Sequence, residues 1–408
     1  MLNIRSSDNV TRFLFPALIF WLIVLTAVFF FAQLNEAVHK PLWGDEVYGL
    51  QTSVRADGFA SMLVRGVPGQ GSPAPLDYLA LKCLDRIREP VSYFGLHSYV
   101  YYRLWANSAT ALSIIFVVLL FAHQIYKRRD GASKPLQIIL LGFVPVIFLF
   151  SRMVYYYAAE MRPYALWDAL WFIVLAVSLS ERRTERGWIV VLILLALSAT
   201  TSVFQIGVTA LSYGIVRLIN GRPFKETALD VLKIFGLPLL IVFNYCLRVG
   251  EWGEHEIGES WPVFWKMWAH ESVTIPLMLG AIALCFFRAE NRKYAVAPLS
   301  VLFIYLIGPL IFFVTKLKGF FFADRQYIYY DLTNAIFLLT LIQCLPGYAP
   351  LLKKRAAAVL VLSLVLLVGA AVAFRPKVCR KMAAAFHKAG AVLADPALVR
   401  SSETMMRY

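Results

Sequence analysis

Long apolar runs separated by short polar connections make up most of the chain. A helix needs about 20 mostly apolar residues to cross the hydrocarbon core of a bilayer, and eleven runs reach or approach that length. We expect transmembrane helices at Phe13–Leu34, Arg103–Tyr126, Leu136–Val154, Pro163–Ser180, Trp188–Ser202, Val203–Ile219, Leu229–Arg248, Val273–Phe287, Ala295–Val314, Tyr327–Leu345 and Ala356–Phe374. The pattern predicts an all-α, polytopic membrane protein with about eleven spans, of which the two within 188–219 are only marginally long enough.

Basic residues in the connections indicate one orientation. Lys and Arg accumulate on the cytoplasmic side of short loops. Here they fall on alternate connections, at Lys127/Arg128/Arg129, Arg182/Arg183/Arg186, Arg217/Arg222/Lys225, Arg288/Arg292/Lys293 and Lys353/Lys354/Arg355. We expect the N-terminus on this cytoplasmic face. The opposite face would carry the first loop at 35–102 and the connections at 152–162, 250–272 and 315–326.

The expected domain organisation is a single transmembrane module at 1–374 and a short tail at 375–408. An odd number of spans places the tail outside, although its four basic residues near 375–381 run against the positive-inside trend. No mitochondrial-type presequence or terminal retention signal is present. We therefore expect a multi-pass protein of a bacterial inner membrane, with its outer loops in the periplasm.

The first extracytoplasmic loop contains apolar residues at helical spacing. They are Leu76, Leu79, Ala80, Cys83, Leu84 and Ile87. Charged residues such as Asp77, Lys82 and Asp85 occupy the other positions. This pattern predicts an amphipathic juxtamembrane helix that lies along the membrane surface and roofs a cavity.

Composition excludes most other classes of protein. Of the 408 residues, 60% are hydrophobic and 16% are charged, whereas soluble domains are about 45–50% apolar and about 25% charged. The 40 Lys+Arg against 25 Asp+Glu give a net charge of +15. Because the basic residues lie in short runs between apolar blocks, and no nucleic-acid motif occurs, the charge indicates membrane topology rather than a nucleic-acid partner.

Adjacent carboxylates follow the first apolar run, in the segment Trp43-Gly44-Asp45-Glu46. A carboxylate pair can take a proton from an incoming hydroxyl or hold a divalent metal ion. The competing interpretation is that Asp45 simply caps the N-terminus of a helix beginning at Glu46. The residues alone leave the two interpretations about equal.

A second candidate site lies where Glu160 and Arg162 precede Pro163 and Tyr164. Proline suits the first position of a helix and disfavours helical geometry in the residue before it, so Arg162 is expected at a helix mouth. An arginine can bind a phosphate through two parallel hydrogen bonds. The alternative is an interfacial belt of tyrosines with a snorkelling arginine, which the neighbouring tyrosines at 155–157 also fit.

A third candidate site is the connection at 315–326, which is basic although it is predicted to lie outside. Its charged residues are Lys316, Lys318, Asp324 and Arg325, and Tyr327 follows. An anionic lipid headgroup or a phosphate leaving group would account for positive charge on that face, as would contact with bulk anionic lipid. The connection at 250–272 is rich in Glu and Trp, and we interpret it as a solvated acidic loop.

These residues resemble the integral-membrane GT-C glycosyltransferases, in particular the bacterial relatives of protein O-mannosyltransferases and of the lipid A aminoarabinose transferase. Residues 43–46 (WGDE) resemble the family's first-loop aspartate motif, and 157–166 (YAAEMRPYAL) resemble its YxxExRPYAL segment. The segment 72–79 (SPAPLDYL) is similar to HPPLYYL, with Ser72 in place of the histidine. Residues 325–327 (RQY) resemble an Arg-Tyr pair that enters a late helix, with one residue inserted.

The resemblance implies a GT-C fold and a glycosyltransferase that uses a polyprenyl phosphate sugar as donor, with inversion at the anomeric carbon. It implies Asp45 as general base with Glu46 as its helper. Residues that would bind the donor phosphate or sugar are Glu160, Arg162, Tyr164, Arg325, Tyr327, Lys316 and Lys82. The acceptor would be a hydroxyl of a lipid, glycan or protein, and a divalent metal ion would be held, if at all, by Asp45 and Glu160.

Two other functions fit the same residues. A transporter or flippase for a lipid-linked or anionic substrate would use the charged outer mouth for binding, although transporters favour internal repeats and ionisable residues at mid-bilayer. Asp168 is the main buried candidate for such a role. An inactive membrane scaffold would keep the fold and tolerate Asp45→Ala.

Overall fold

The structure is a computed structural model of the chain, and it describes residues 4–39, 46, 49–55, 58–67, 74–87, 98–128, 133–149, 151–181, 184–249, 257–317 and 332–352. Over these residues the chain is all-α and has no β-strand, as predicted. It divides into two compact units that interleave along the sequence. Unit 1 comprises Met1–Leu42, Ile87–Met161 and Leu345–Tyr408, and unit 2 comprises Trp43–Arg86 and Arg162–Cys344.

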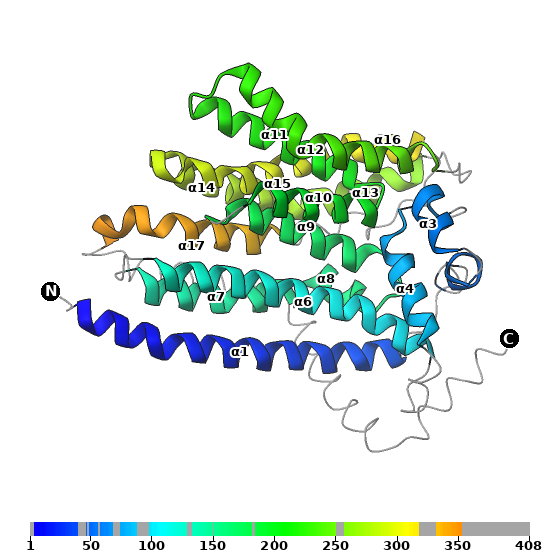
Figure 1. The fold of residues 1–408 in the computed structure, drawn as a ribbon, viewed down its shortest axis with the longest axis horizontal. Helices are drawn as coiled ribbons and strands as arrows, with labels where there is room; N and C mark the ends of the chain where they lie inside the picture. Colours follow the sequence, from blue (N-terminus) through cyan, green and yellow to red (C-terminus); the bar gives the residue numbers. More distant parts are fainter. Residues whose placement is uncertain are drawn as a thin grey trace, which may run out of the picture. The chain divides into compact units, whose positions relative to one another are not determined.

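Unit 1 is built on long apolar helices that lie side by side (Figure 1). Its described helices are α1 (Ile4–His39), α6 (Ser98–Lys127), α7 (Lys134–Leu149) and α8 (Arg152–Tyr157). The last carbonyls of a helix lack partners within it. At the end of α1 one of them, the carbonyl of Ala37, accepts a 2.9 Å hydrogen bond from the fully buried guanidinium of Arg103 in α6.

Unit 2 contains the helices of the first loop and most of the later helices. Those of the first loop are η1 (Gly49–Val54), α3 (Phe59–Arg65) and α4 (Leu76–Arg86). The later ones are α9 (Tyr164–Leu179), α10 (Glu185–Ser198), α11 (Ser202–Ile219), α12 (Phe224–Cys246), α13 (Ile257–His270), η2 (Glu271–Val273), α14 (Thr274–Phe286), η3 (Ala289–Ala295), α15 (Val296–Leu306), α16 (Gly308–Leu317) and α17 (Thr333–Leu352), which crosses into unit 1 after Cys344.

The core of unit 2 forms around α9. Nearly all of its residues are buried, and it packs against α10 and α15. Rings from three other helices meet nearby, with the Trp188 ring 5.6 Å from that of Tyr213 and 5.2 Å from that of Phe235. A helix that is apolar on nearly every side suits a position inside the unit.

The chain is a multi-pass integral membrane protein. Among the described residues five helices are long and apolar enough to cross a membrane, at Thr11–Val38, Val100–Lys127, Ser202–Ile219, Phe224–Cys246 and Ser260–Phe286. A sixth candidate span is formed if Ala289–Leu306 and Gly308–Leu317 are one bent helix. The predicted runs at 136–154, 163–180 and 327–345 correspond to shorter apolar helices, and the run at 356–374 lies outside the described residues.

Two predictions about unit 2 need correction. The second half of the connection predicted at 250–272 is helical instead, because α13 runs through η2 into α14 and the whole forms one candidate span. The run predicted at 295–314 is bent by 52° between α15 and α16. Pro309 has no N–H to bond the carbonyl of Tyr305 four residues earlier, which accounts for the break at Ile307.

Candidate functional site

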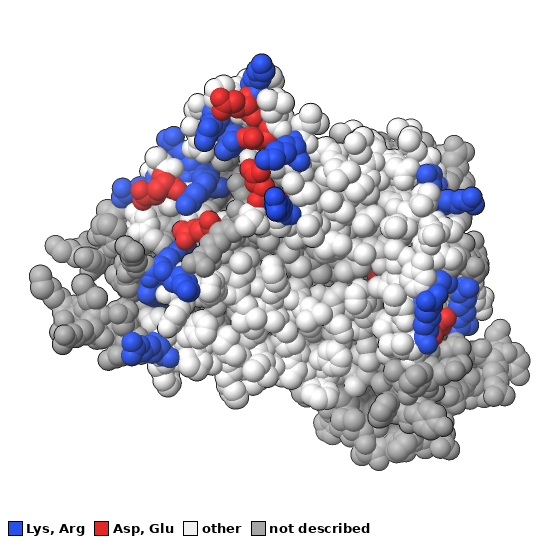
Figure 2. Space-filling view, viewed as in Figure 1, with Lys and Arg blue, Asp and Glu red and all other residues white. Residues whose placement is uncertain are grey.

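One end of unit 2 is held together by pairs of opposite charges. Arg217 at the end of α11 pairs with Asp230 in α12, and the Lys233 ammonium lies 2.6 Å from a carboxylate oxygen of Glu185. The Tyr294 hydroxyl in η3 donates a 2.8 Å hydrogen bond to Glu181, just after α9. We call this the basic end of unit 2. Figure 2 shows it as mixed blue and red atoms over the α11–α12 turn.

The opposite end of unit 2 lies where α12 ends. There the first-loop helix α3 is hydrogen-bonded to the last residues of α12 and to Arg248 just after it. The Tyr245 hydroxyl donates a 2.6 Å hydrogen bond to the carbonyl of Leu63. The Arg248 guanidinium donates another, also 2.6 Å, to the carbonyl of Val64, and a third of 3.0 Å to Asn244. Helices of the first loop are thus fixed to a membrane helix by bonds to the last carbonyls of α3. We call this the loop end.

The first-loop helices are also joined to one another. The Lys82 ammonium in α4 donates a 2.6 Å hydrogen bond to the carbonyl of Val54 at the end of η1. It also lies 5.9 Å from the centre of the Phe59 ring, and the Arg86 guanidinium lies 4.5 Å from the same ring. Lys82, which we predicted to bind the donor, therefore holds η1, α3 and α4 together in this structure.

The predicted amphipathic helix exists as α4, but the side that packs inward is not the predicted apolar stripe. Asp77 is only 1% exposed, and Tyr78 and Leu81 are buried beside it. The apolar stripe, by contrast, ends in the exposed Cys83 and Ile87. Because lipid accepts apolar side chains as readily as a protein core does, the apolar stripe of a membrane protein need not face inward.

Glu46 is a buried carboxylate at the start of this structured loop, with 1% of its surface exposed. It precedes Gly49 in η1 by three residues, so its Cα lies within about 11 Å of that of Gly49. A charged carboxylate is costly to bury, so a buried glutamate in a membrane protein is a candidate functional residue. Its predicted partner Asp45 lies outside the described residues.

Arg162 and Tyr164 lie toward the loop end of unit 2. Pro163 is in helical geometry directly before α9, and α9 begins at Tyr164, one residue later than predicted. Glu181, just after α9, is bonded to Tyr294 in the basic end, so α9 ends there. The start of α9 therefore lies toward the opposite end of unit 2. Arg162 is half-buried, and its guanidinium lies 5.9 Å from the centre of the Tyr164 ring, which leaves a charged group at the mouth of the helix.

The residues before Arg162 belong to unit 1 and are buried. Glu160 is 2% exposed, and Tyr155 and Tyr157 in α8 are also buried. Gln33 in α1 donates a 2.7 Å hydrogen bond to the carbonyl of Tyr155. Burial, reinforced by the negative charge of Glu36, raises the pKa of the Tyr155 phenol. Burial of these tyrosines disfavours the interfacial aromatic belt, because belt residues face the headgroups.

Lys316 is a buried cation near the end of α16, with 2% of its surface exposed. The helix pair α15–α16 starts beside the basic end and leads away from it, so Lys316 lies away from that end. Its helix is covered by α13, where the Phe264 and Phe312 rings stack with centres 4.7 Å apart. Arg325 and Tyr327, which follow α16 in sequence, lie outside the described residues.

No group of three or more His, Cys, Asp or Glu side chains in the described ranges is arranged to hold a metal ion. The two residues predicted for that role do not form a described pair, since Asp45 is outside those ranges and Glu160 lies in unit 1. Sequence reasoning assigned Asp77 and Arg103 no chemical role. Asp77 stands on the polar face of a predicted surface helix, and only a contact between distant helices reveals that it is buried.

The chain matches no protein-family model, no curated protein and no solved structure with which it was compared. Its function must therefore be inferred from its own residues.

Proposed function

We propose that the chain is an inverting glycosyltransferase of the GT-C type, which moves a sugar from a polyprenyl phosphate to a hydroxyl acceptor. The observation that carries the proposal is that three ionisable groups of low exposure lie away from the basic end of unit 2: the buried Glu46 in the first loop, the half-buried Arg162 and the buried Lys316. Buried charges are costly in a membrane protein and mark functional sites by default. A carboxylate and cations together suit proton removal beside an anionic leaving group.

The proposed arrangement has about eleven spans, with the loop end outside the cytoplasm. Its support is the basic end of unit 2, where the arginines at 186, 217, 222, 288 and 292 stand in or beside the connections of neighbouring helices. Such connections prefer the cytoplasm. The first loop and the site would then face the periplasm across a bacterial inner membrane, with α4 as a juxtamembrane helix.

In the proposed reaction a single displacement occurs at the anomeric carbon. The acceptor oxygen forms a bond to that carbon while the bond from the carbon to the phosphate oxygen breaks, and the electron pair of the broken bond stays on the phosphate. Asp45 takes the acceptor proton, and Glu46 orients Asp45 or the hydroxyl. The configuration is inverted because one displacement occurs rather than two.

The cations would stabilise the departing phosphate. Arg162 offers a planar fork that matches two phosphate oxygens, whereas Lys316 and Arg325 would add positive charge where negative charge develops. Tyr164, Tyr327 and Glu160 are suited to bind sugar hydroxyls, and Lys82 would reach the same region from α4. The prenyl chain would lie between membrane helices.

Native mass spectrometry of the purified protein tests donor binding directly. The wild type is expected to retain a polyprenyl phosphate or its glycosylated form, and Arg325→Ala is expected to lose it. Arg222→Ala is the matched control, because Arg222 is exposed at the basic end. If the wild type retains no prenyl phosphate from membranes rich in that lipid, the donor assignment is wrong.

A transporter of an anionic lipid remains the second candidate because of one observation. Asp168 lies in α9, a largely buried helix of unit 2, and is 1% exposed. Buried acidic residues inside membrane helices mark ion and substrate pathways in transporters. Lipid scrambling or uptake in proteoliposomes that is abolished by Asp168→Asn, without sugar transfer by the wild type, would favour transport.

A further inference from the structure

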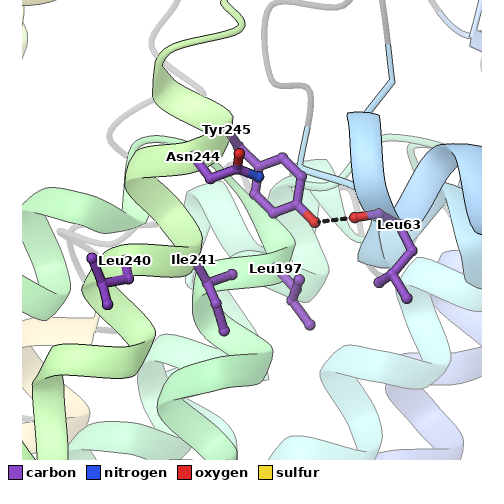
Figure 3. A pocket seen from close by; sticks show the side chains of 6 residues that line it. All are labelled: Leu63, Leu197, Leu240, Ile241, Asn244 and Tyr245. Atoms are coloured by element: carbon purple, nitrogen blue, oxygen red, sulfur yellow. Dashed lines mark hydrogen bonds between the residues drawn. The ribbon is translucent and has the colours of Figure 1, made fainter.

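A mostly apolar pocket of about 440 Å³ lies near the loop end of unit 2, between α3, α10 and α12. Its lining residues are Leu63, Leu197, Leu240, Ile241, Asn244 and Tyr245 (Figure 3). The pocket is a shallow, widely open hollow, and its two polar residues are both on the last turns of α12. None of the residues in the proposed transferase site lines it.

The chemistry of the walls restricts what can fill the pocket. Leu240 is strongly exposed, and so are Leu237 and Phe243 on the same helix, which is a candidate membrane span. The open side therefore faces hydrocarbon. Water is disfavoured in a space with so few polar partners, and an empty space would lose the dispersion contacts of its lining. A hydrocarbon chain from the bilayer satisfies both conditions.

The polar end of the pocket indicates which lipid supplies that chain. Asn244 accepts a hydrogen bond from the exposed Arg248, and Arg65, which is also exposed, ends α3 on the other side. An apolar chain gains little by moving from bilayer to pocket, because both are hydrocarbon. The selectivity must therefore come from the headgroup. A phosphate beside an arginine gains a charge-assisted hydrogen bond, and the attraction is strongest when no cationic group in the same headgroup offsets the phosphate charge.

We propose that this pocket binds one acyl chain of an anionic phospholipid, with the phosphate at Arg248. The bound lipid would occupy the space under α3 and support the contact of the first loop with α12, which the Tyr245 and Arg248 hydrogen bonds to Leu63 and Val64 already make. This inference does not depend on the transferase activity, and a failure of either leaves the other intact.

Photo-crosslinking in nanodiscs tests the proposal on the full chain. The probes are phosphatidylglycerol and phosphatidylcholine that carry the same photoactivatable acyl chain, and peptide mass spectrometry locates the labelled residues. We expect labelling of the segment 240–245 to be about fivefold higher with phosphatidylglycerol, which is what one basic residue near a lipid of net negative charge provides. Phosphatidylcholine also carries a phosphate, but its quaternary ammonium cancels that charge. Leu240→Trp should fill the pocket and abolish this labelling, whereas Arg248→Gln should equalise the two probes.

Leu229→Trp is the matched control. Leu229 is on α12, is exposed like Leu240 and precedes it by eleven residues, so it lies on nearly the same helix face but outside the pocket. The Leu229→Trp variant should show the same excess of phosphatidylglycerol labelling at 240–245 as the wild type. Equal labelling by both probes in the wild type, or labelling that survives Leu240→Trp, would overturn the proposal. So would displacement of phosphatidylglycerol by an equimolar polyprenyl phosphate, which would assign the pocket to a prenyl chain.

Discussion

Two buried ionisable residues, Glu46 and Lys316, are the features of this chain that most need a functional explanation. Glu46 and Lys316 are both almost completely shielded from solvent, in a protein whose charged residues mostly occupy helix ends. A charged residue inside a membrane protein is costly to bury and is a functional candidate by default. In the transferase proposal, Glu46 assists the general base Asp45, and Lys316 binds the phosphate.

Replacing Lys316 by methionine tests the second role. Methionine has a similar length and suits a buried position, so the fold should persist. Loss of one charge-assisted bond to the departing phosphate should lower kcat/KM for sugar transfer by about tenfold or more. Lys293→Met, at the basic end, is the control and should behave like the wild type. An unchanged kcat/KM in Lys316→Met would remove Lys316 from the site.

At the scale of elements, the first loop depends on a few bonds to membrane helices. The Tyr245 hydroxyl and the Arg248 guanidinium bind adjacent carbonyls near the end of α3, and Lys82 binds the end of η1. Each bond satisfies a carbonyl that its own helix leaves unpartnered. Removing one bond should therefore loosen the loop without unfolding the membrane helices.

Tyr245→Phe removes one of these bonds and keeps the ring. A hydrogen bond of this kind contributes about 1 kcal/mol, so local opening of α3 should become about fivefold more frequent. Hydrogen–deuterium exchange of the amides at 59–65 is the measurement. Tyr126→Phe, at an exposed tyrosine of α6, should leave that exchange unchanged. Equal exchange in Tyr245→Phe would show that the hydroxyl does not hold α3.

The contact between α13 and α15 should contribute measurably to the stability of the protein. The Trp268 and Tyr305 rings stack with centres 5.0 Å apart, and each side chain donates a 2.9 Å hydrogen bond to the carbonyl of the other residue. Trp268→Phe keeps an aromatic ring but removes the indole donor. The free energy of unfolding should fall by about 1 kcal/mol, visible as a lower thermal midpoint in detergent. Trp265→Phe, at a more exposed position, should have a smaller effect.

Elements bounded by clear polar connections were predictable from sequence. The ranges predicted for α9 and α11 agree with the structure within one residue at each end, because charged or small polar residues flank both apolar runs. The helix α13 was not predicted, since the glutamates near 251–259 suggested a loop. Its aromatic residues at 261, 264, 265 and 268 follow helical spacing and are the signal that could have revealed it.

The arrangement of the candidate site was less predictable than its residue types. Carboxylates and cations on outer connections could be identified from charge and topology. The burial of Asp77 and the bonds from Tyr245 and Arg248 to the first loop join residues up to 184 positions apart in sequence. Such contacts depend on how helices pack, and a hydrophobic pattern does not encode which neighbour an amphipathic helix meets.

At the scale of the whole molecule, the proposal requires that the first loop and the α11–α12 turn lie on opposite sides of the membrane. Cys83 in α4 and Arg222 in that turn are both exposed. With the cysteines at 246, 285, 344 and 379 replaced by serine, an impermeant maleimide should label Cys83 in spheroplasts. In an otherwise cysteine-free chain, the Arg222→Cys variant should be labelled only after permeabilisation. The reverse pattern would invert the topology.

The central claim is that the chain transfers a sugar from a polyprenyl phosphate with a first-loop carboxylate as base. The most direct measurement is the release of polyprenyl phosphate from glycosylated donors by the purified protein in nanodiscs supplied with candidate acceptors. We expect turnover by the wild type, a loss of about 100-fold or more in Asp45→Asn, and a smaller loss in Glu46→Gln. Glu226→Gln, at an exposed carboxylate of the basic end, should retain full activity. Undiminished turnover in a folded Asp45→Asn protein would contradict the claim.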